Sequence, residues 1–246
     1  MVFADADDGI DLDTYEILIN ALESTQSDIS ACNLRSEYRQ FEVREKNQET
    51  DILTYQGTKE LVEAFFFKIG GWAWNKLYRR EVISDVRFRE DISQAEDALF
   101  SWQVIKKAKK ICYTDLPLYH YRFALTSSSR MANTEKLKTA IIAWDIVKKD
   151  LDSLNIDEPI VQKWANNYIV WNLKICESMI SLKHPEQQKS YMYARKNIAK
   201  YKKYIPAMSR RYQILARSVL TSWGTYKFLG MLSYGMKKAY VNIRNR

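Results

Sequence analysis

The chain begins Met1-Val-Phe-Ala-Asp-Ala-Asp-Asp8, a short apolar run that ends in three carboxylates. Such a run predicts a buried strand, and carboxylates at the end of a strand emerge together at the rim of a sheet. Side-chain alternation then places Asp5 and Asp7 on one side, with Ala6 facing away. Two carboxylates so placed can share one Mg²⁺ or Mn²⁺, leaving the other ligand positions to phosphate and water. Acidic residues that cap the next helix in solvent are an equally good interpretation of this segment alone.

The composition is that of a large folded protein rich in helix. The 246 residues are 46% apolar, enough for a sizeable core. Seven Trp and sixteen Tyr against seven Gly and four Pro favour long helices and aromatic clusters over a turn-rich all-β protein. Cys32, Cys112 and Cys176 have no short spacing, which favours reduced, cytoplasmic thiols over a zinc site or a disulfide framework. No leader segment or membrane-spanning apolar run is evident, so we expect neither secretion by that route nor an integral membrane protein.

The positive charge is concentrated at the end of the chain. The formal net charge is +8, but Glu186 is the last acidic residue and fourteen Lys or Arg follow it. Such a segment is drawn to an anionic surface, which charge alone does not identify among phospholipid, nucleic acid and a polyphosphorylated substrate. Residues 212–240 mix aromatic, apolar and basic side chains without any acid, which favours the headgroup region of a membrane. A packed helix with a solvated basic face is the alternative, and nucleic acid is disfavoured because no reader motif accompanies the charge.

Helices and strands are predicted to alternate in the first half of the chain. Hydrophobic periodicity and turn residues define the boundaries of these elements. The expected elements are a strand in the opening run, an Asp-capped helix over 15–22, a strand over 28–34, a loop or edge hairpin over 35–49, a helix over 57–67, a helix from the 92–100 segment to near Lys110, and short strands over 110–114 and 118–121. From Asn133 onward we expect three or four long helices and no strand. The fold class is therefore α/β followed by a helical region, divided into 1–130 and 131–246.

A second acidic pair, Glu96-Asp97, lies at the start of a predicted helix. A carboxylate held rigidly there can act as a general base that deprotonates an acceptor hydroxyl. Taken alone, the pair is more simply explained as N-terminal capping of the helix.

A third candidate is the predicted strand that ends Tyr119-His120-Tyr121-Arg122 and continues into the hydroxyl-rich segment Thr126 to Arg130. Arg122 and Arg130 suit the oxygens of a diphosphate, although such a segment alone is more often a simple connection. His120 and His184 lack a recognisable serine or cysteine partner, which leaves a hydrolase triad unsupported. Neither a P-loop nor a G-x-G-x-x-G motif is present, which argues against a nucleotide-binding kinase or a dehydrogenase.

Taken together and in order, four segments of the chain resemble family 2 glycosyltransferases. These segments are Phe3-Ala-Asp-Ala-Asp-Asp-Gly-Ile-Asp11, Trp74-Asn-Lys-Leu-Tyr78, Glu96-Asp-Ala-Leu-Phe100 and Pro117-Leu-Tyr-His-Tyr-Arg122. The resemblance covers residues 1 to about 130. Family 2 enzymes have the GT-A fold, invert the anomeric carbon and assemble bacterial polysaccharides.

The resemblance implies a role for each motif. Asp5 and Asp7, with Asp8 adjacent, would hold a divalent metal, Mg²⁺ or Mn²⁺, and the nucleotide-sugar. In the pair Glu96-Asp97, the aspartate would be the inverting base, and Arg122 would steady the leaving diphosphate. The segment from Trp74 through Asn75 to Lys76 would lie at the acceptor and donor-sugar end of the pocket.

The resemblance also implies partners and a location. The acceptor would be a saccharide or a polyprenyl-diphosphate-linked sugar, and the protein would be cytoplasmic and peripherally bound to the inner face of the membrane. The family's nucleotide-binding first half has no counterpart before Asp5, so we expect this chain to lack that half. The alternative interpretation is therefore a catalytically inactive remnant that binds a membrane surface or a partner.

Overall fold

The computed structural model describes residues 1–37, 51–122, 133–181 and 187–244. They belong to two compact units, one comprising residues 1–90 and 95–127 and the other residues 91–94 and 128–246. Most of the predicted 35–49 loop, and the hydroxyl-rich segment with Arg130, lie outside the described residues.

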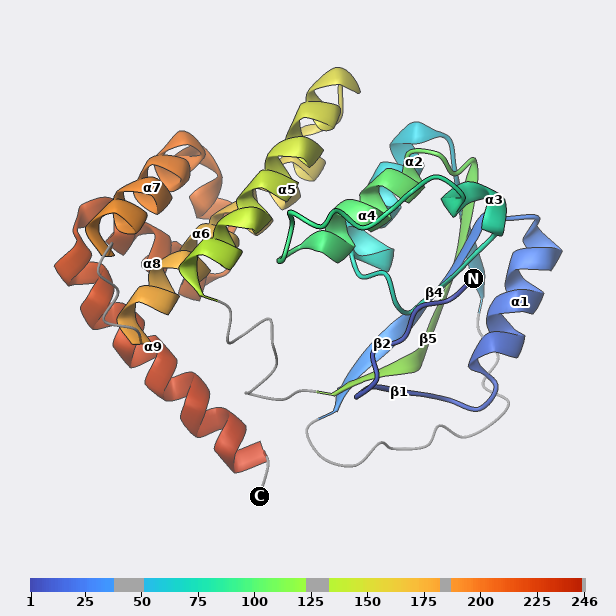
Figure 1. The fold of residues 1–246 in the computed structure, drawn as a ribbon, viewed down its shortest axis with the longest axis horizontal. Helices are drawn as coiled ribbons and strands as arrows, with labels where there is room; N and C mark the ends of the chain where they lie inside the picture. The colour runs from blue at the N-terminus through green and yellow to red at the C-terminus, as the bar shows by residue number, and fades with distance from the viewer. Residues whose placement is uncertain (38–50, 123–132, 182–186, 245–246) are drawn as a thin grey trace. The chain divides into compact units, whose positions relative to one another are not determined.

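The first unit is built on a mixed five-stranded sheet (Figure 1). The longest strand, β5, runs parallel to β2 and antiparallel to both β1 and β3, which pair with different stretches of it. On its other side β2 pairs with β4 in antiparallel register. The strands are β1 (Gly9–Ile10), β2 (Ile29–Glu37), β3 (Ile52–Gln56), β4 (Lys76–Tyr78) and β5 (Lys110–Arg122). The predicted strand over 28–34 is therefore confirmed, and β5 is the strand to which most of the sheet is attached.

The prediction of two short strands over 110–114 and 118–121 is wrong, because both belong to β5. The register against β2 shifts on both sides of Asn33, which pairs with Pro117. A bulge of this kind accommodates a proline, which has no N–H to give to the ladder. The proline therefore interrupts the pairing pattern without ending the strand.

The opening run forms less strand than its sequence predicts. Val2 makes a single β-bridge with Leu77 of β4, and no longer ladder follows. The chain turns immediately afterward, because the N–H of Asp8 donates to the carbonyl oxygen of Asp5 over 3.2 Å, the bond that closes a β-turn. Strand alternation therefore does not set the directions of Asp5 and Asp7, which the turn positions instead.

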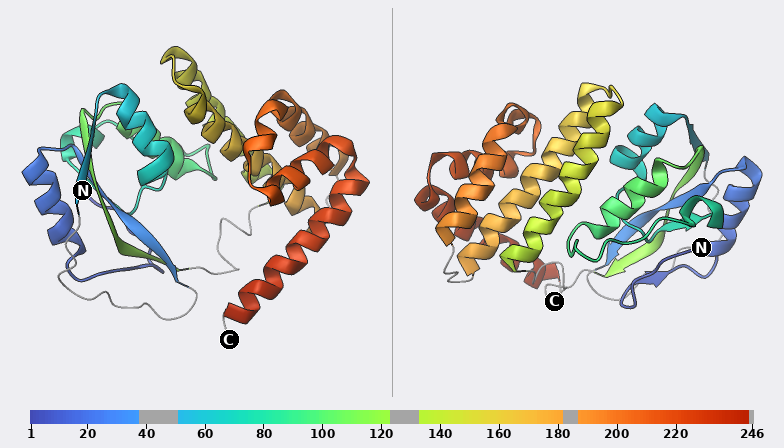
Figure 2. Two further views of the ribbon diagram at one scale, coloured as in Figure 1. Left: turned by 180° about the vertical axis from the view of Figure 1, so that it is seen from behind. Right: turned by 45° about the horizontal axis from the view of Figure 1, so that its top comes forward.

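Helices cover both faces of the sheet. The front and rear views agree that α1 lies against one face and that α2 and α4 lie against the other (Figures 1 and 2). Leu18 of α1 belongs to a buried cluster with Cys32, Leu118 and Tyr119. The helices are α1 (Thr14–Thr25), α2 (Thr58–Ala64), its π-helical continuation η1 (Phe65–Ile69), α3 (Arg80–Ile83) and α4 (Glu96–Ile105). The predicted first helix is confirmed, but Asp13 at its N-cap makes no side-chain capping bond.

The described part of the second unit contains helices and no strand, as predicted. Trp164 lies in its core and donates from its indole nitrogen to the carbonyl oxygen of Trp144 over 2.8 Å. The elements are α5 (Thr134–Ser153), α6 (Glu158–Ser181), α7 (Gln187–Lys200), the 3₁₀ turn η2 (Lys202–Ala207), α8 (Arg210–Thr221) and α9 (Trp223–Arg244). The described residues of this unit thus form five α-helices, more than the three or four expected. Across both units the three cysteines are buried and free of disulfides, as expected.

Candidate functional site

The acidic turn at the start of the chain is attached to β5 by Tyr119. The buried Tyr119 hydroxyl accepts from the N–H of Asp5 over 3.1 Å and donates to Oδ2 of Asp8 over 2.7 Å. The other oxygen of Asp8 accepts from the backbone N–H of Arg122 over 2.7 Å. Both oxygens of Asp8 are thus engaged by β5, whereas the side chains of Asp5 and Asp7 are exposed.

The pair Glu96-Asp97 is held at the start of α4 by an unusual backbone conformation. Ala95 precedes the helix at φ 62°, a left-handed conformation that non-glycine residues seldom adopt. The backbone N–H of Ala73 donates to the carboxylate of Asp97. Burial nevertheless raises the pKa of Asp97 above its ordinary value, against the lowering by Ala73 and by the charge of Lys76. The carboxylate is therefore more basic than that of an exposed aspartate.

The two acidic motifs come together in the folded chain. Although Asp5 is accessible at the surface, partial desolvation by its neighbours raises its pKa, and the negative charges of Asp8, Asp97 and Asp7 raise it further. Burial likewise raises the pKa of Glu96, with smaller increases from Asp97 and Asp5. These five carboxylates, which we call the acidic cluster, are therefore close enough to interact although about ninety residues separate the motifs.

The acidic cluster offers oxygen ligands for a hard divalent cation. Asp5 and Asp7 are exposed carboxylates of the kind that Mg²⁺ and Mn²⁺ prefer, whereas Asp8 is already engaged by Tyr119. In the part of the chain that the structure describes, no group of three or more His, Cys, Asp or Glu side chains could hold a metal. A cation held there would take one or two carboxylates as ligands and would complete its shell with phosphate and water.

The side chains of Trp74, Asn75 and Lys76 are buried, with exposed fractions of 2–5%. Asn75 adopts φ 54° and donates from its amide to the carbonyl oxygen of Cys32 over 2.6 Å. Nζ of Lys76 donates to the carbonyl oxygens of Ile69 and Trp72 and to Oδ1 of Asn75, each within 2.8 Å. The polar groups of Asn75 and Lys76 thus make hydrogen bonds inside the protein. Contact of these three residues with a sugar stays a prediction.

Two residues of the fourth motif have separate surroundings. Nε2 of His120 lies 2.9 Å from Oδ1 of Asp11, and both side chains are buried. The pair links the segment after β1 to β5. The side chain of Arg122 is exposed at the end of β5, and its backbone N–H binds Asp8. The structure thus places Arg122 beside the acidic turn.

Sequence reasoning did not single out Tyr119 or Trp72 as site residues. The motif Pro117–Arg122 gives Tyr119 no sequence signal of its own, although its hydroxyl organises the acidic turn. Trp72 is 43% exposed next to Ala73, whose N–H binds Asp97. The preceding pair Gly70-Gly71 was a usable signal, because paired glycines indicate a close approach of the backbone to another element.

The chain is similar to two curated proteins of Bacillus subtilis (strain 168). One is EpsH, named as a glycosyltransferase, with 30% identity over 184 residues that make up 72% of this chain and 52% of EpsH. The other is EpsJ, named as an uncharacterized glycosyltransferase, with 30% identity over 125 residues, 49% of this chain and 36% of EpsJ. The chain thus spans about half the length of EpsH, and less of EpsJ. No protein-family model matches the chain.

Solved structures establish the fold. TarS residues 1–349 of S. aureus in complex with UDP-GlcNAc match 96% of this chain and 67% of that chain, with a TM-score of 0.55 and 16% identity. The complex of the same fragment with UDP gives a TM-score of 0.54 and 15% identity. Likeness at this identity speaks for the fold alone. The predicted class, an α/β sheet of GT-A type followed by a mainly helical region, is therefore confirmed.

Proposed function

We propose that this chain is part of a glycosyltransferase that moves a sugar from a nucleotide-sugar donor to a saccharide or lipid-linked acceptor in cell-surface polysaccharide biosynthesis. The supporting observation is the acidic cluster, in which an exposed pair of carboxylates lies near a rigidly held basic carboxylate. Similarity to EpsH and EpsJ, both named as glycosyltransferases, points to the same reaction class.

In the proposed reaction Asp97 accepts the proton of the acceptor hydroxyl. The freed oxygen attacks the anomeric carbon of the donor, a new C–O bond forms, and the bond to the nucleoside diphosphate breaks on the opposite face, which inverts the configuration. The N–H of Ala73 keeps the base in position, and burial raises its pKa so that it can hold the proton. We assign Glu96 to the same catalytic pair because its pKa responds to Asp97.

The donor diphosphate is proposed to lie over the acidic turn. Asp5 and Asp7 would hold Mg²⁺ or Mn²⁺ there, and the cation would supply positive charge to the diphosphate oxygens. Asp8 keeps the turn in shape through Tyr119, and Arg122, whose backbone N–H binds Asp8 at the end of β5, would bind the leaving diphosphate.

The first experiment separates donor binding from transfer. UDP-GlcNAc with Mn²⁺ is titrated into the full chain by calorimetry, and radiolabelled sugar transfer is measured to soluble glycosides and to polyprenyl-diphosphate-linked glycans. We expect Asp97→Asn to bind the donor normally and to lose transfer by about 10²–10⁴-fold. Asp115→Asn is the matched control, since Asp115 bonds to Asn33 and Tyr113 outside the acidic cluster. Full transfer by Asp97→Asn rejects the base, and the absence of saturable donor binding favours a non-catalytic remnant.

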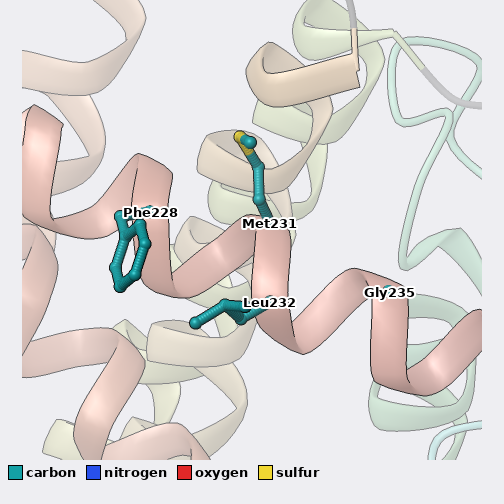
Figure 3. Close-up of a pocket in the computed structure, with 4 residues that line it drawn as sticks. All are labelled: Phe228, Met231, Leu232 and Gly235. Atoms are coloured by element: carbon teal, nitrogen blue, oxygen red, sulfur yellow. The ribbon is translucent and has the colours of Figure 1, made fainter.

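A second proposal concerns α9 and an anionic membrane surface. The hydroxyl of Tyr226 donates to the carbonyl oxygen of Leu173 on α6, so one face of α9 is packed. Phe228, Met231 and Leu232 are 51–64% exposed at i, i+3 and i+4, and together with Gly235 they line a shallow apolar depression (Figure 3). An exposed apolar face on a basic helix without acids suits anionic headgroups. Among the described residues no helix is both long and apolar enough to cross a bilayer.

We therefore propose peripheral binding of the protein to the cytoplasmic face of the membrane, where a lipid-linked acceptor lies. The test is cosedimentation with phosphatidylglycerol and with phosphatidylcholine vesicles. We expect binding to the anionic vesicles, weakened by salt and by the double substitution Phe228→Ala with Leu232→Ala. Met192→Ala, at an equally exposed position on α7, is the control. Equal binding to both lipids, or no effect of the double substitution, contradicts this proposal.

A further inference from the structure

Trp72 is a partly exposed aromatic residue that directly precedes Ala73, the backbone neighbour of the proposed base. The residue is 43% exposed, whereas Ala73 and Trp74, which follow it, are buried. A large apolar side chain left exposed beside convergent polar groups is a common feature of ligand sites. The contacts around Trp72 show how the fold holds this residue in position.

Three contacts hold the backbone around Trp72 against the first turns of α4. The carbonyl oxygen of Trp72 accepts from Oγ of Ser101 over 3.0 Å. A methyl group added to Gly71 would lie 2.8 Å from Cβ of Ala98, so the chain touches α4 before Trp72 as well. After Trp72, the N–H of Ala73 binds the carboxylate of Asp97. Trp72 is therefore bracketed on both sides by contacts with the helix that carries the base.

The indole ring is held as firmly as the backbone. It stacks on Trp74 with ring centroids 5.1 Å apart and 21° between the planes, and Trp74 stacks on Tyr119 at 4.4 Å and 16°. Gly70, at φ 66°, lies against the same ring so closely that any side chain there would collide with it. Tyr119 is the residue that holds the acidic turn. One continuous stack thus connects the acidic turn to the exposed ring, which loses little freedom when a ligand binds.

We infer that Trp72 is a stacking platform for the acceptor sugar, a pyranoside with one apolar face of axial C–H groups, as in a β-glucoside. Such a ring carries the axial C–H groups of positions 1, 3 and 5 on one face, and these polarised hydrogens are attracted to the negative face of an indole. The inference rests on the proposed function for the identity of the ligand. The acceptor is assigned rather than the donor because Trp72 is joined to α4, the helix that carries Asp97, and directly precedes Ala73, whose backbone N–H binds Asp97, whereas the donor diphosphate belongs over Asp5 and Asp7. Stacking would orient the hydroxyl toward the base.

The test measures binding without catalysis. Saturation-transfer NMR with methyl β-D-glucopyranoside is recorded on the full chain, on Trp72→Ala, on Trp72→Phe and on Phe67→Ala. Phe67 is the matched control, an aromatic residue on η1 with a comparable 47% exposure. We expect transfer to the hydrogens of positions 1, 3 and 5, an increase in Kd of about tenfold in Trp72→Ala, partial retention in Trp72→Phe and no change in Phe67→Ala.

Three results would overturn the inference: no saturation transfer to the wild-type chain, an unchanged Kd in Trp72→Ala, or an equal loss in Phe67→Ala. Circular dichroism of each variant shows whether it is folded, and Trp72→Phe keeps the test decisive if Trp72→Ala is not. If the chain binds the glycoside through Trp72 but transfers no sugar from any donor, the proposed function fails and the sugar site stands. If transfer occurs with unchanged acceptor KM in Trp72→Phe and Trp72→Ala, the site fails and the function stands.

Discussion

The phenolic hydroxyl of Tyr119 donates a 2.7 Å hydrogen bond to the carboxylate of Asp8, 111 residues earlier in the chain. The same oxygen accepts from the backbone N–H of Asp5. One buried side chain of β5 therefore holds both ends of the acidic turn, and the direction in which Asp5 and Asp7 point depends on it.

Replacing Tyr119 with Phe should loosen this turn. The substitution keeps the ring stacked on Trp74 but leaves the N–H of Asp5 and one oxygen of Asp8 without their partner. We expect a loss of about 1–3 kcal/mol in the free energy of unfolding and weaker Mn²⁺-dependent binding of UDP-GlcNAc. Urea denaturation and calorimetry measure the two effects.

Tyr113→Phe on the same strand is the control for that substitution. It removes a 2.8 Å hydrogen bond to Asp115, which lies outside the acidic cluster. Some stability should be lost, with no change in the metal dependence of donor binding. If both variants bind the donor equally well, Tyr119 has only a structural role.

The sequence predicted the local elements well because their signals are local. The hydrophobic period of α1 and the apolar run of β2 each lie within a dozen residues. The acidic turn was mistaken for a continued strand because its shape depends on Tyr119, far away in the chain. Similarly, β5 was divided in two because the local effect of Pro117 is visible in the sequence, whereas the bulge that accommodates it depends on pairing with β2.

The residue types of the candidate site could be predicted from the sequence, but the backbone contacts that position them could not. Asp5, Asp7 and Asp97 belong to acidic motifs that are visible as short local patterns in the sequence. The left-handed conformation of Ala95 and the N–H of Ala73 that binds Asp97 do not, because both depend on how α4 meets the preceding loop. Backbone donors leave no residue-type signature, so sequence patterns cannot reveal them.

Gly71→Ala should disturb the contact between the loop before Trp72 and helix α4. The new methyl group would lie 2.8 Å from Cβ and 3.0 Å from Cα of Ala98, so the loop or α4 must move. We expect a loss of about 1–3 kcal/mol in unfolding free energy and a lower transfer rate, because the bond from Ala73 to Asp97 is disturbed. Gly235→Ala in α9 is the matched control. Its new methyl group meets nothing within 4 Å, so helix propensity should stabilise it by roughly 0.5–1 kcal/mol. Equal stability of the two variants contradicts the predicted overlap.

Lys76→Met should change how stability depends on pH. Burial lowers the pKa of Lys76 from 10.5 to about 7 in the folded chain. Between these two values the unfolded chain binds the proton and the folded chain does not, so this group makes the wild type more stable as pH rises from about 7. The free energy of unfolding of the wild type, relative to Lys76→Met, should therefore rise by up to about 1.4 kcal/mol per pH unit between pH 7.5 and 9. Urea denaturation across that range measures it, and a flat difference shows that Lys76 keeps an ordinary pKa.

The same substitution should move the pH dependence of catalysis. Asp97 must be ionised to accept the acceptor proton, so kcat/KM should rise with pH through its pKa, which burial raises above the ordinary value of 3.8. The charge of Lys76 opposes that rise, and Lys76 carries its proton in the acidic range where the limb lies. Removing the charge in Lys76→Met should therefore shift the acidic limb of the kcat/KM profile to higher pH. This shift is expected whether or not the maximal kcat/KM also changes. A variant with a lower rate but an unmoved limb would mean that Lys76 supports the loop through Ile69 and Trp72 alone, without acting on the base.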